Sequence, residues 1–111
     1  MKKDDDVYIS DIIECCRIIL DHLNGVCENE FERNILIQDA VIRRFEIIGE
    51  AASKISDEFK AMHQDVEWQL IKDMRNKLIH EYFGVSAITI YETALTDIPP
   101  LIEGYSFENQ F

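Results

Sequence analysis

The sequence has no run of apolar residues long enough to cross a lipid bilayer, and no charged, apolar and small-residue leader at its start. We therefore expect a soluble, unexported protein that stays in the cytoplasm and makes no membrane contact. Its cysteines, Cys15, Cys16 and Cys27, are odd in number, and none is spaced with histidines as in a zinc site. The sequence thus predicts neither a disulfide framework nor bound zinc, and the cysteines should be small core or surface residues.

Positive charge is also scarce. Lysine and arginine number 11 against 22 acidic residues, which gives a net charge of −11. Such a deficit normally argues against nucleic acid, because binding phosphate requires positive charge. However, residues 43–77 hold seven basic and seven acidic residues, so the flanks carry the whole negative charge. A polyanion would therefore have to bind to this central segment, and the acidic flanks suit a basic partner protein.

Strand-like alternation, internal repeats and low-complexity tracts are absent as well. Apolar residues instead recur at helical spacing in four segments, and a length of 111 residues suits one domain. The sequence therefore predicts a single all-α domain over residues 1–111. Its expected architecture is an antiparallel four-helix bundle with room for one short extra helix.

The first two helices are predicted from apolar stripes and from the residues that end them. The first covers about residues 8–23 and ends at Asn24-Gly25, and an acidic connector follows over 26–33. The second covers about residues 34–53, where Gly49 should let another helix approach closely. A polar stretch with at most one helical turn comes next.

The other two helices are predicted from caps and breakers. The third begins after Asp65 and ends at Gly84, and the fourth begins after Ser86. Pro99-Pro100 should break or restart the fourth. The residues expected to point inward are Leu70, Ile71, Met74 and Leu78 on the third helix and Ile88, Tyr91, Leu95 and Ile98 on the fourth.

The third predicted helix ends in "MRNKLIHEYFG", residues 74–84, which is rich in polar groups. On a helical wheel Arg75 and His80 lie about 140° apart, with Ile79 exposed between them. One isolated helix would hold the two side chains apart, whereas two copies packed about a twofold axis could bring both pairs to one cleft. The spacing therefore favours a homodimer.

Plainer interpretations of these residues remain open at this point. A histidine near a helix C-terminus often only places positive charge at the negative end of the dipole, and Arg75 with Asn76 could form a solvated face. Arg75 and His80 both lie outside the stripe of the third helix that is expected to be buried. Tyr82 could simply pack its ring and hydrogen-bond its hydroxyl.

Other polar residues are expected to be structural or solvated. Arg44 falls inside the apolar stripe of the second helix, which favours a paired or snorkelling arginine over one that contacts RNA. Glu46 and Glu50 should form a solvated or dimer-facing stripe with Arg43 rather than an acid–base pair. The remaining histidines, His22 and His63, should lie at the surface near helix ends, so no metal site is expected.

Three stretches together resemble the HepT-like branch of the HEPN superfamily. "RNKLIHEYFG" (75–84) is similar to its signature of Arg, four residues, His, one residue and Tyr. "QDAVIRRFEIIGEAASKIS" (38–56) resembles its second helix, and "WQLIKDMRNKLIH" (68–80) resembles its third. The resemblance covers nearly the whole chain. It implies an all-α homodimer that acts as the ribonuclease toxin of a toxin–antitoxin pair, with a minimal nucleotidyltransferase of the MntA type as antitoxin.

The resemblance also implies roles for individual residues. Arg75 and His80 take the catalytic places, and Asn76 takes a supporting place. Tyr82 takes the place of the tyrosine that the antitoxin modifies with AMP. Further candidates for RNA contact are Lys72, Lys77 and Arg43.

The chemistry of these side chains suits RNA cleavage. RNA carries its own nucleophile, the 2′-hydroxyl, so cleavage needs proton transfer and charge stabilisation without necessarily needing a metal or cofactor. His80 suits proton transfer, and Arg75 suits stabilisation of a charged phosphorane. The leading hypothesis is a metal-independent ribonuclease acting on tRNA or mRNA. The alternatives are an inactive HEPN module that binds nucleotide or a nucleotidyltransferase, and a structural helical adaptor.

Overall fold

The computed structural model describes residues 4–64, 66, 68–80 and 87–106, except the side chains of Met74 and of residues 77–80 and 102–106. Every regular element in this part of the chain is a helix. In order they are α1 (Asp5–Leu23), α2 (Glu28–Arg33), α3 (Ile35–Lys54), α4 (Asp57–Met62), α5 (Trp68–His80) and α6 (Ala87–Ser106). The predicted all-α bundle is confirmed, with two short helices in addition to four long ones.

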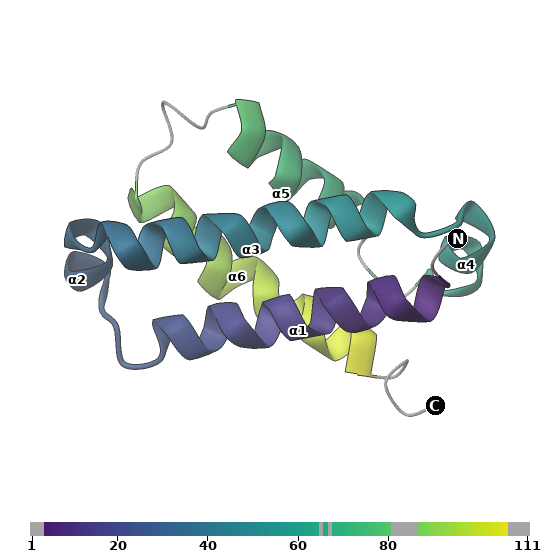
Figure 1. Ribbon diagram of the computed structural model, residues 1–111, viewed down its shortest axis with the longest axis horizontal. Coiled ribbons are helices and arrows are strands. Elements are labelled where there is room, and N and C mark those ends of the chain that lie inside the picture. The colour runs from purple at the N-terminus through teal and green to yellow at the C-terminus, as the bar shows by residue number, and fades with distance from the viewer. Residues whose placement is uncertain (1–3, 65, 67, 81–86, 107–111) are drawn as a thin grey trace.

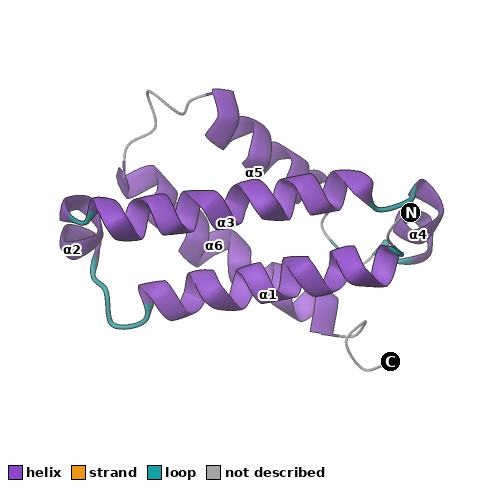
Figure 2. Cartoon of the chain, viewed as in Figure 1, coloured by secondary structure: helices purple, strands orange, loops and turns teal. Residues whose placement is uncertain are grey.

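The long helices α1, α3, α5 and α6 alternate in direction (Figure 1). α1 and α3 run side by side, α6 packs behind them, and α5 crosses α3. The short helices α2 and α4 lie at opposite ends of the α1–α3 pair (Figure 2). α3 is therefore the central helix, since it contacts α1, α2, α5 and α6. No helix in the described part of the chain is long and apolar enough to span a membrane.

Apolar stripes at helical spacing hold the bundle together. Ile12 and Ile19 of α1 and Phe45 and Ile48 of α3 are fully buried. Burying a side chain of this size contributes roughly 1.5–3 kcal/mol. As predicted, the cysteines divide between core and surface: Cys15 and Cys16 are buried, and Cys27 is exposed.

The acidic connector predicted over 26–33 contains a helix. α2 forms there around Phe31, which is fully buried and whose ring centroid lies 5.4 Å from that of Tyr91 in α6. The Tyr91 hydroxyl donates a hydrogen bond of 2.8 Å to the carbonyl oxygen of Val26. Periodicity did not reveal α2 because a helix of six residues with one apolar side chain has no stripe.

The predicted break at Pro99-Pro100 is wrong, because α6 continues through both prolines. A proline inside a helix removes one N–H group and crowds the carbonyl four residues earlier. The carbonyls concerned belong to Leu95 and Thr96. Both residues are exposed, so water can hydrogen-bond to these carbonyls. The buried face of the helix keeps Ile98 in the core.

Two predicted inward faces are partly wrong. Leu95 is 47% exposed, and Ile90 and Ala94 are buried in its place. On α5, Ile71 is buried as predicted, whereas Leu70 is half-buried. The other residues predicted to point inward on α5, Met74 and Leu78, lie outside the described side chains, and so do the predicted boundary residues Asp65, Gly84 and Ser86.

Side-chain caps fix where α3 and α4 begin. The Asn34 side chain accepts a hydrogen bond of 3.1 Å from the backbone N–H of Ile37, and Ser56 does the same for Phe59. Asp5 accepts hydrogen bonds from the backbone N–H and the hydroxyl of Ser56, at 3.0 and 2.7 Å. The start of α4 is thereby tied to the start of α1. The ring of Phe59 in α4 meets that of Trp68, which places α4 beside the N-terminal end of α5.

Candidate active site

The candidate site begins where α5 crosses α3 at Gly49. A Cβ atom added at Gly49 would lie 2.6 Å from Cγ and 2.7 Å from Cβ of Arg75. Atoms so near the backbone of α5 cannot swing away, so any larger residue would push the helices apart. The prediction that Gly49 lets another helix approach is therefore confirmed.

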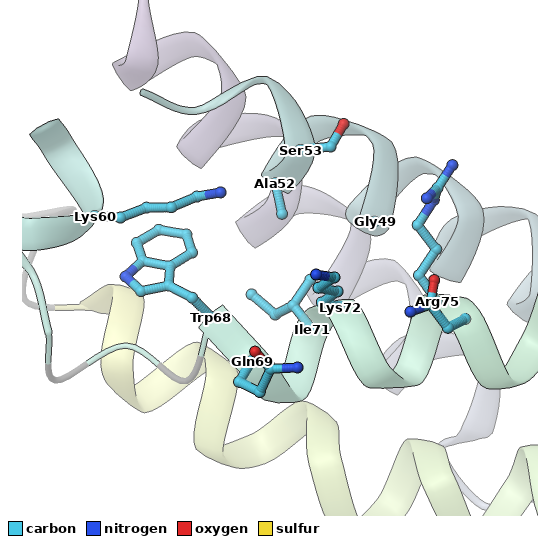
Figure 3. Close-up of a pocket in the computed structure, with 10 residues that line it drawn as sticks. Gly49, Ala52, Ser53, Lys60, Trp68, Gln69, Ile71, Lys72 and Arg75 are labelled. Atoms are coloured by element: carbon cyan, nitrogen blue, oxygen red, sulfur yellow. The ribbon is translucent and has the colours of Figure 1, made fainter. Parts of the chain in front are cut away.

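Arg75 reaches from α5 across this contact. Its stem packs on Gly49, and its guanidinium extends past the glycine (Figure 3). The residue is half-buried, and its stem packs in the contact between the helices, so Arg75 is more buried than its predicted place outside the buried stripe implies. Arg75 takes no part in the ion pairs on α3, which join Arg43 to Glu46 and Lys54 to Glu50.

A cavity of about 420 Å³ opens between α3, α4 and α5 beside Arg75. α3 forms one wall, Lys60 of α4 closes one end, and α5 supplies the remaining lining (Figure 3). Three cations line the cavity, and none of its ten described lining residues is acidic. The lining residues are Gly49, Ala52, Ser53, Lys60, Trp68, Gln69, Ile71, Lys72, Arg75 and Asn76.

The structure brings three of the predicted site residues together. Arg75, Asn76 and Lys72 all line the cavity. α5 is a continuous helix from Arg75 to His80, so the two backbones are separated by roughly 7.5 Å of rise and about 140° of rotation. The side chains of His80 and Lys77, and the whole of Tyr82, lie outside the described residues.

Arg43 does not reach this cavity within one protomer. It is six residues before Gly49 on α3, which turns it about 120° away. Its side chain is 64% exposed and pairs with Glu46 at 3.3 Å. Glu50 pairs with Lys54 at 3.5 Å and is 60% exposed, which is consistent with the predicted solvated or dimer-facing stripe.

Arg44 has a structural role between α1 and α3. Its side chain is half-buried and interacts with Cys15 of α1. Burial raises the pKa of the Cys15 thiol, and the interaction with Arg44 partly offsets this rise. The interpretation of Arg44 as a structural arginine is favoured, because it is not among the residues that line the cavity.

The two remaining histidines lie near helix ends, as predicted. His22 is exposed in the last turn of α1, and His63 caps the C-terminal end of α4. The His63 ring packs on Phe59, with 4.3 Å between ring centroids, and is half-buried. Within the described residues, no three histidine, cysteine, aspartate or glutamate side chains come together as a metal site would require.

Reasoning from the sequence missed Lys60 and Trp68. Trp68 is the single tryptophan of the chain and stands at the start of α5. Its indole N–H donates a hydrogen bond of 3.0 Å to the carbonyl oxygen of His63, and the Lys60 ammonium lies 5.7 Å from the ring centroid. No local pattern joins these two residues, because they lie eight positions apart with the acidic residues Asp65 and Glu67 between them.

Comparison with known proteins identifies relatives that cover most of the chain. A protein of Caldanaerobacter subterraneus named "Putative RNase" is 39% identical to the chain over 94 residues, which are 85% of this chain and 84% of the relative. A "Probable ribonuclease HepT" of Thermococcus cleftensis is 40% identical over 101 residues, which are 91% of this chain and 92% of the relative. No solved structure is significantly similar to the chain.

The family match covers most of the domain. Residues 12–105 match the family described as "Ribonuclease HepT-like", and this range contains every helix from α2 to α5 as well as most of α1 and α6. The chain therefore belongs to the family of HepT-like ribonucleases.

Proposed function

We propose that the chain is the metal-independent ribonuclease toxin of a type VII toxin–antitoxin pair. The observation that carries the proposal is the position of Arg75 on a cavity that is lined by cations, in a protein whose net charge is −11. Its stem is held in place by α3, and its head is outside the ion pairs of that helix. A guanidinium whose stem is packed in this way can bind phosphate oxygens with two hydrogen bonds.

The proposed reaction uses the 2′-hydroxyl of RNA as nucleophile. A bond forms between the 2′-oxygen and phosphorus while His80 takes the hydroxyl proton, and Arg75 stabilises the charged phosphorane. The bond from phosphorus to the 5′-oxygen then breaks, and that oxygen receives a proton from His80 of the partner subunit. The products are a 2′,3′-cyclic phosphate and a 5′-hydroxyl.

We expect the purified protein to cleave single-stranded RNA to these two ends in the presence of a chelator. Replacing the ribose at the cleaved position by deoxyribose should stop cleavage there, because the nucleophile is gone. Analysis of product ends on denaturing gels, before and after phosphatase treatment, makes the measurement. A 5′-phosphate on the product, or cleavage of the deoxy substrate, would exclude this mechanism.

The proposed site requires a homodimer. The continuous helix holds Arg75 and His80 about 140° apart, so one copy of α5 does not aim both groups at one phosphate. A second copy about a twofold axis supplies the missing group. Ile35 and Leu36 of α3, which are 68% and 82% exposed, show that one protomer leaves apolar surface uncovered.

We expect a dimer at micromolar concentration, since the composite site depends on it. Sedimentation velocity at several protein concentrations gives the oligomeric state. A monomer that still cleaves RNA under the same conditions would rule out the composite site.

The proposed antitoxin is a small nucleotidyltransferase that transfers AMP to Tyr82. The acidic flanks of the chain suit a basic surface on this partner, with an association rate that falls as salt is raised. The alternative function is an inactive HEPN module that binds nucleotide or such a partner, and the cation-lined cavity suits that role as well. Cleavage by the purified protein distinguishes the two.

A further inference from the structure

The cavity combines an aromatic platform with positive charge, and neither Trp68 nor Lys60 has a part in the reaction proposed above. Three of the 11 lysines and arginines of the chain line it, at a place where no described lining residue is acidic. Proteins that bind single-stranded nucleic acid combine the same two elements, because cations contact the phosphates and aromatic rings stack on the bases.

The indole of Trp68 is held in a defined orientation. Its N–H is hydrogen-bonded to the backbone of His63, and its ring meets Phe59 edge to face, with 6.4 Å between ring centroids. Lys60 lies over the indole, with its ammonium 5.7 Å from the ring centroid. A base that took the place of this ammonium on the ring would release Lys60 toward the phosphate of the same nucleotide. The cavity volume of about 420 Å³ lies within the range of small-molecule sites.

The cavity also lies next to the proposed cleavage centre. Trp68 and Lys72 are one turn apart on α5, and Arg75 follows Lys72 after three further residues. Ser53, Gln69 and Lys72 are exposed, so the cavity reaches the surface along this line. An RNA strand whose scissile phosphate lies at Arg75 can therefore continue along α5 into the cavity.

We propose that the cavity is a nucleotide subsite for RNA, in which the base flanking the cleaved bond stacks on Trp68 and its phosphate pairs with Lys60 and Lys72. The inference rests on the proposed function, because it places the flanking nucleotide relative to Arg75. It assigns Trp68 and Lys60 to substrate binding and not to bond cleavage. These two residues then determine affinity for the flanking nucleotide and leave the chemical step to Arg75 and His80.

The test uses the fluorescence of Trp68, which is the single tryptophan of the chain. The full-length protein is titrated with a short single-stranded oligonucleotide that is 2′-O-methylated and so resists cleavage, while anisotropy of a labelled copy reports binding independently. Quenching that saturates together with anisotropy supports the subsite. Binding without quenching, or no binding up to millimolar oligonucleotide, overturns it. AMP that quenches as tightly as the oligonucleotide would show a mononucleotide site and overturn the assignment to RNA.

Matched variants separate the subsite from general charge effects. Lys60→Gln should weaken oligonucleotide binding about tenfold and lower the slope of log affinity against log salt by roughly 0.7, the value for one phosphate contact to a single strand. Lys54→Gln is the control, because Lys54 pairs with Glu50 on α3 and does not line the cavity. It removes the same charge and should change neither the oligonucleotide affinity nor the salt slope. Equal effects of the two variants would overturn the proposal.

Trp68 variants complete the test. Trp68→Phe keeps an aromatic face and should retain most of the affinity, whereas Trp68→Leu should lose about tenfold to a hundredfold, as loss of base stacking does. In cleavage assays Trp68→Leu should raise KM and change kcat by less than about threefold. A loss confined to kcat would contradict a binding role. Oligonucleotide binding with quenching but without RNA cleavage by the wild type would defeat the proposed function, and only the assignment of the cavity to RNA binding would remain.

Discussion

Arg75→Ala and His80→Ala should each reduce the rate of RNA cleavage by about a thousandfold or more. Removing one group that stabilises a charged transition state typically costs a factor of about 100 to 1,000, and removing a general acid or base costs about 100 to 10,000. In a symmetric dimer each substitution removes two such groups from one cleft. Initial rates on a labelled RNA, measured with excess enzyme, give the comparison.

Two substitutions of Arg75, to alanine and to lysine, should differ in their effect on stability. The stem of Arg75 fills the contact with Gly49, so Arg75→Ala leaves a gap between α3 and α5 and should cost about 1–2 kcal/mol of unfolding free energy. Arg75→Lys keeps most of the stem and the charge but loses the planar fork, so it should be nearly as stable as the wild type and still cleave poorly. Chemical denaturation measures the difference.

Arg17→Gln is the matched control for this series. Arg17 is exposed on α1 and does not line the cavity, so losing its charge should leave cleavage unchanged. Normal cleavage by Arg75→Ala or by His80→Ala would remove the catalytic assignment. A large fall in melting temperature in Arg75→Lys, together with lost activity, would instead indicate a structural arginine.

The long helices could be predicted from the sequence because their apolar spacing is a local property of the chain. The stripe of α3, from Val41 to Ile48, is buried as its periodicity predicts, and Gly49 has the close helix contact expected of it. Arg75 and Asn76 could be placed on one helix for the same reason, since α5 forms over the segment whose apolar spacing predicts it.

The remaining features depend on contacts between distant segments. α2 is held by Phe31 against Tyr91, which are sixty residues apart, and α4 is held by Asp5 on Ser56, with a sequence separation of 51. The continuation of α6 through Pro99 depends on which side of the helix faces solvent. Lys60 and Trp68 could not be recognised as site residues, because their cavity exists only once α4 is docked beside α5.

AMP transfer to Tyr82 should abolish cleavage. The tyrosine oxygen would attack the α-phosphorus of ATP, lose its proton and release pyrophosphate, so each modified protomer gains one phosphate charge and one nucleoside. Tyr82 lies outside the described residues. In the sequence it is seven positions after Arg75, a spacing that on an ideal helical wheel corresponds to roughly 11 Å of rise and about 20° of rotation. The phosphate is bonded to the tyrosine oxygen, and the long side chains of Tyr82 and Arg75 can together span that rise, so the phosphate can pair with Arg75 and exclude RNA phosphate from it.

The experiment incubates the protein with the nucleotidyltransferase and ATP, maps the added mass by peptide spectrometry and then measures RNA cleavage. Tyr82→Phe should escape modification and stay active, because it lacks the acceptor oxygen and keeps the ring. Tyr91→Phe is the matched control: its hydroxyl is hydrogen-bonded to Val26 within the fold, so this variant should still be modified and silenced. AMP found only on another residue, or full cleavage by protein modified at Tyr82, would refute this mode of control, because the phosphate would then not be occupying Arg75.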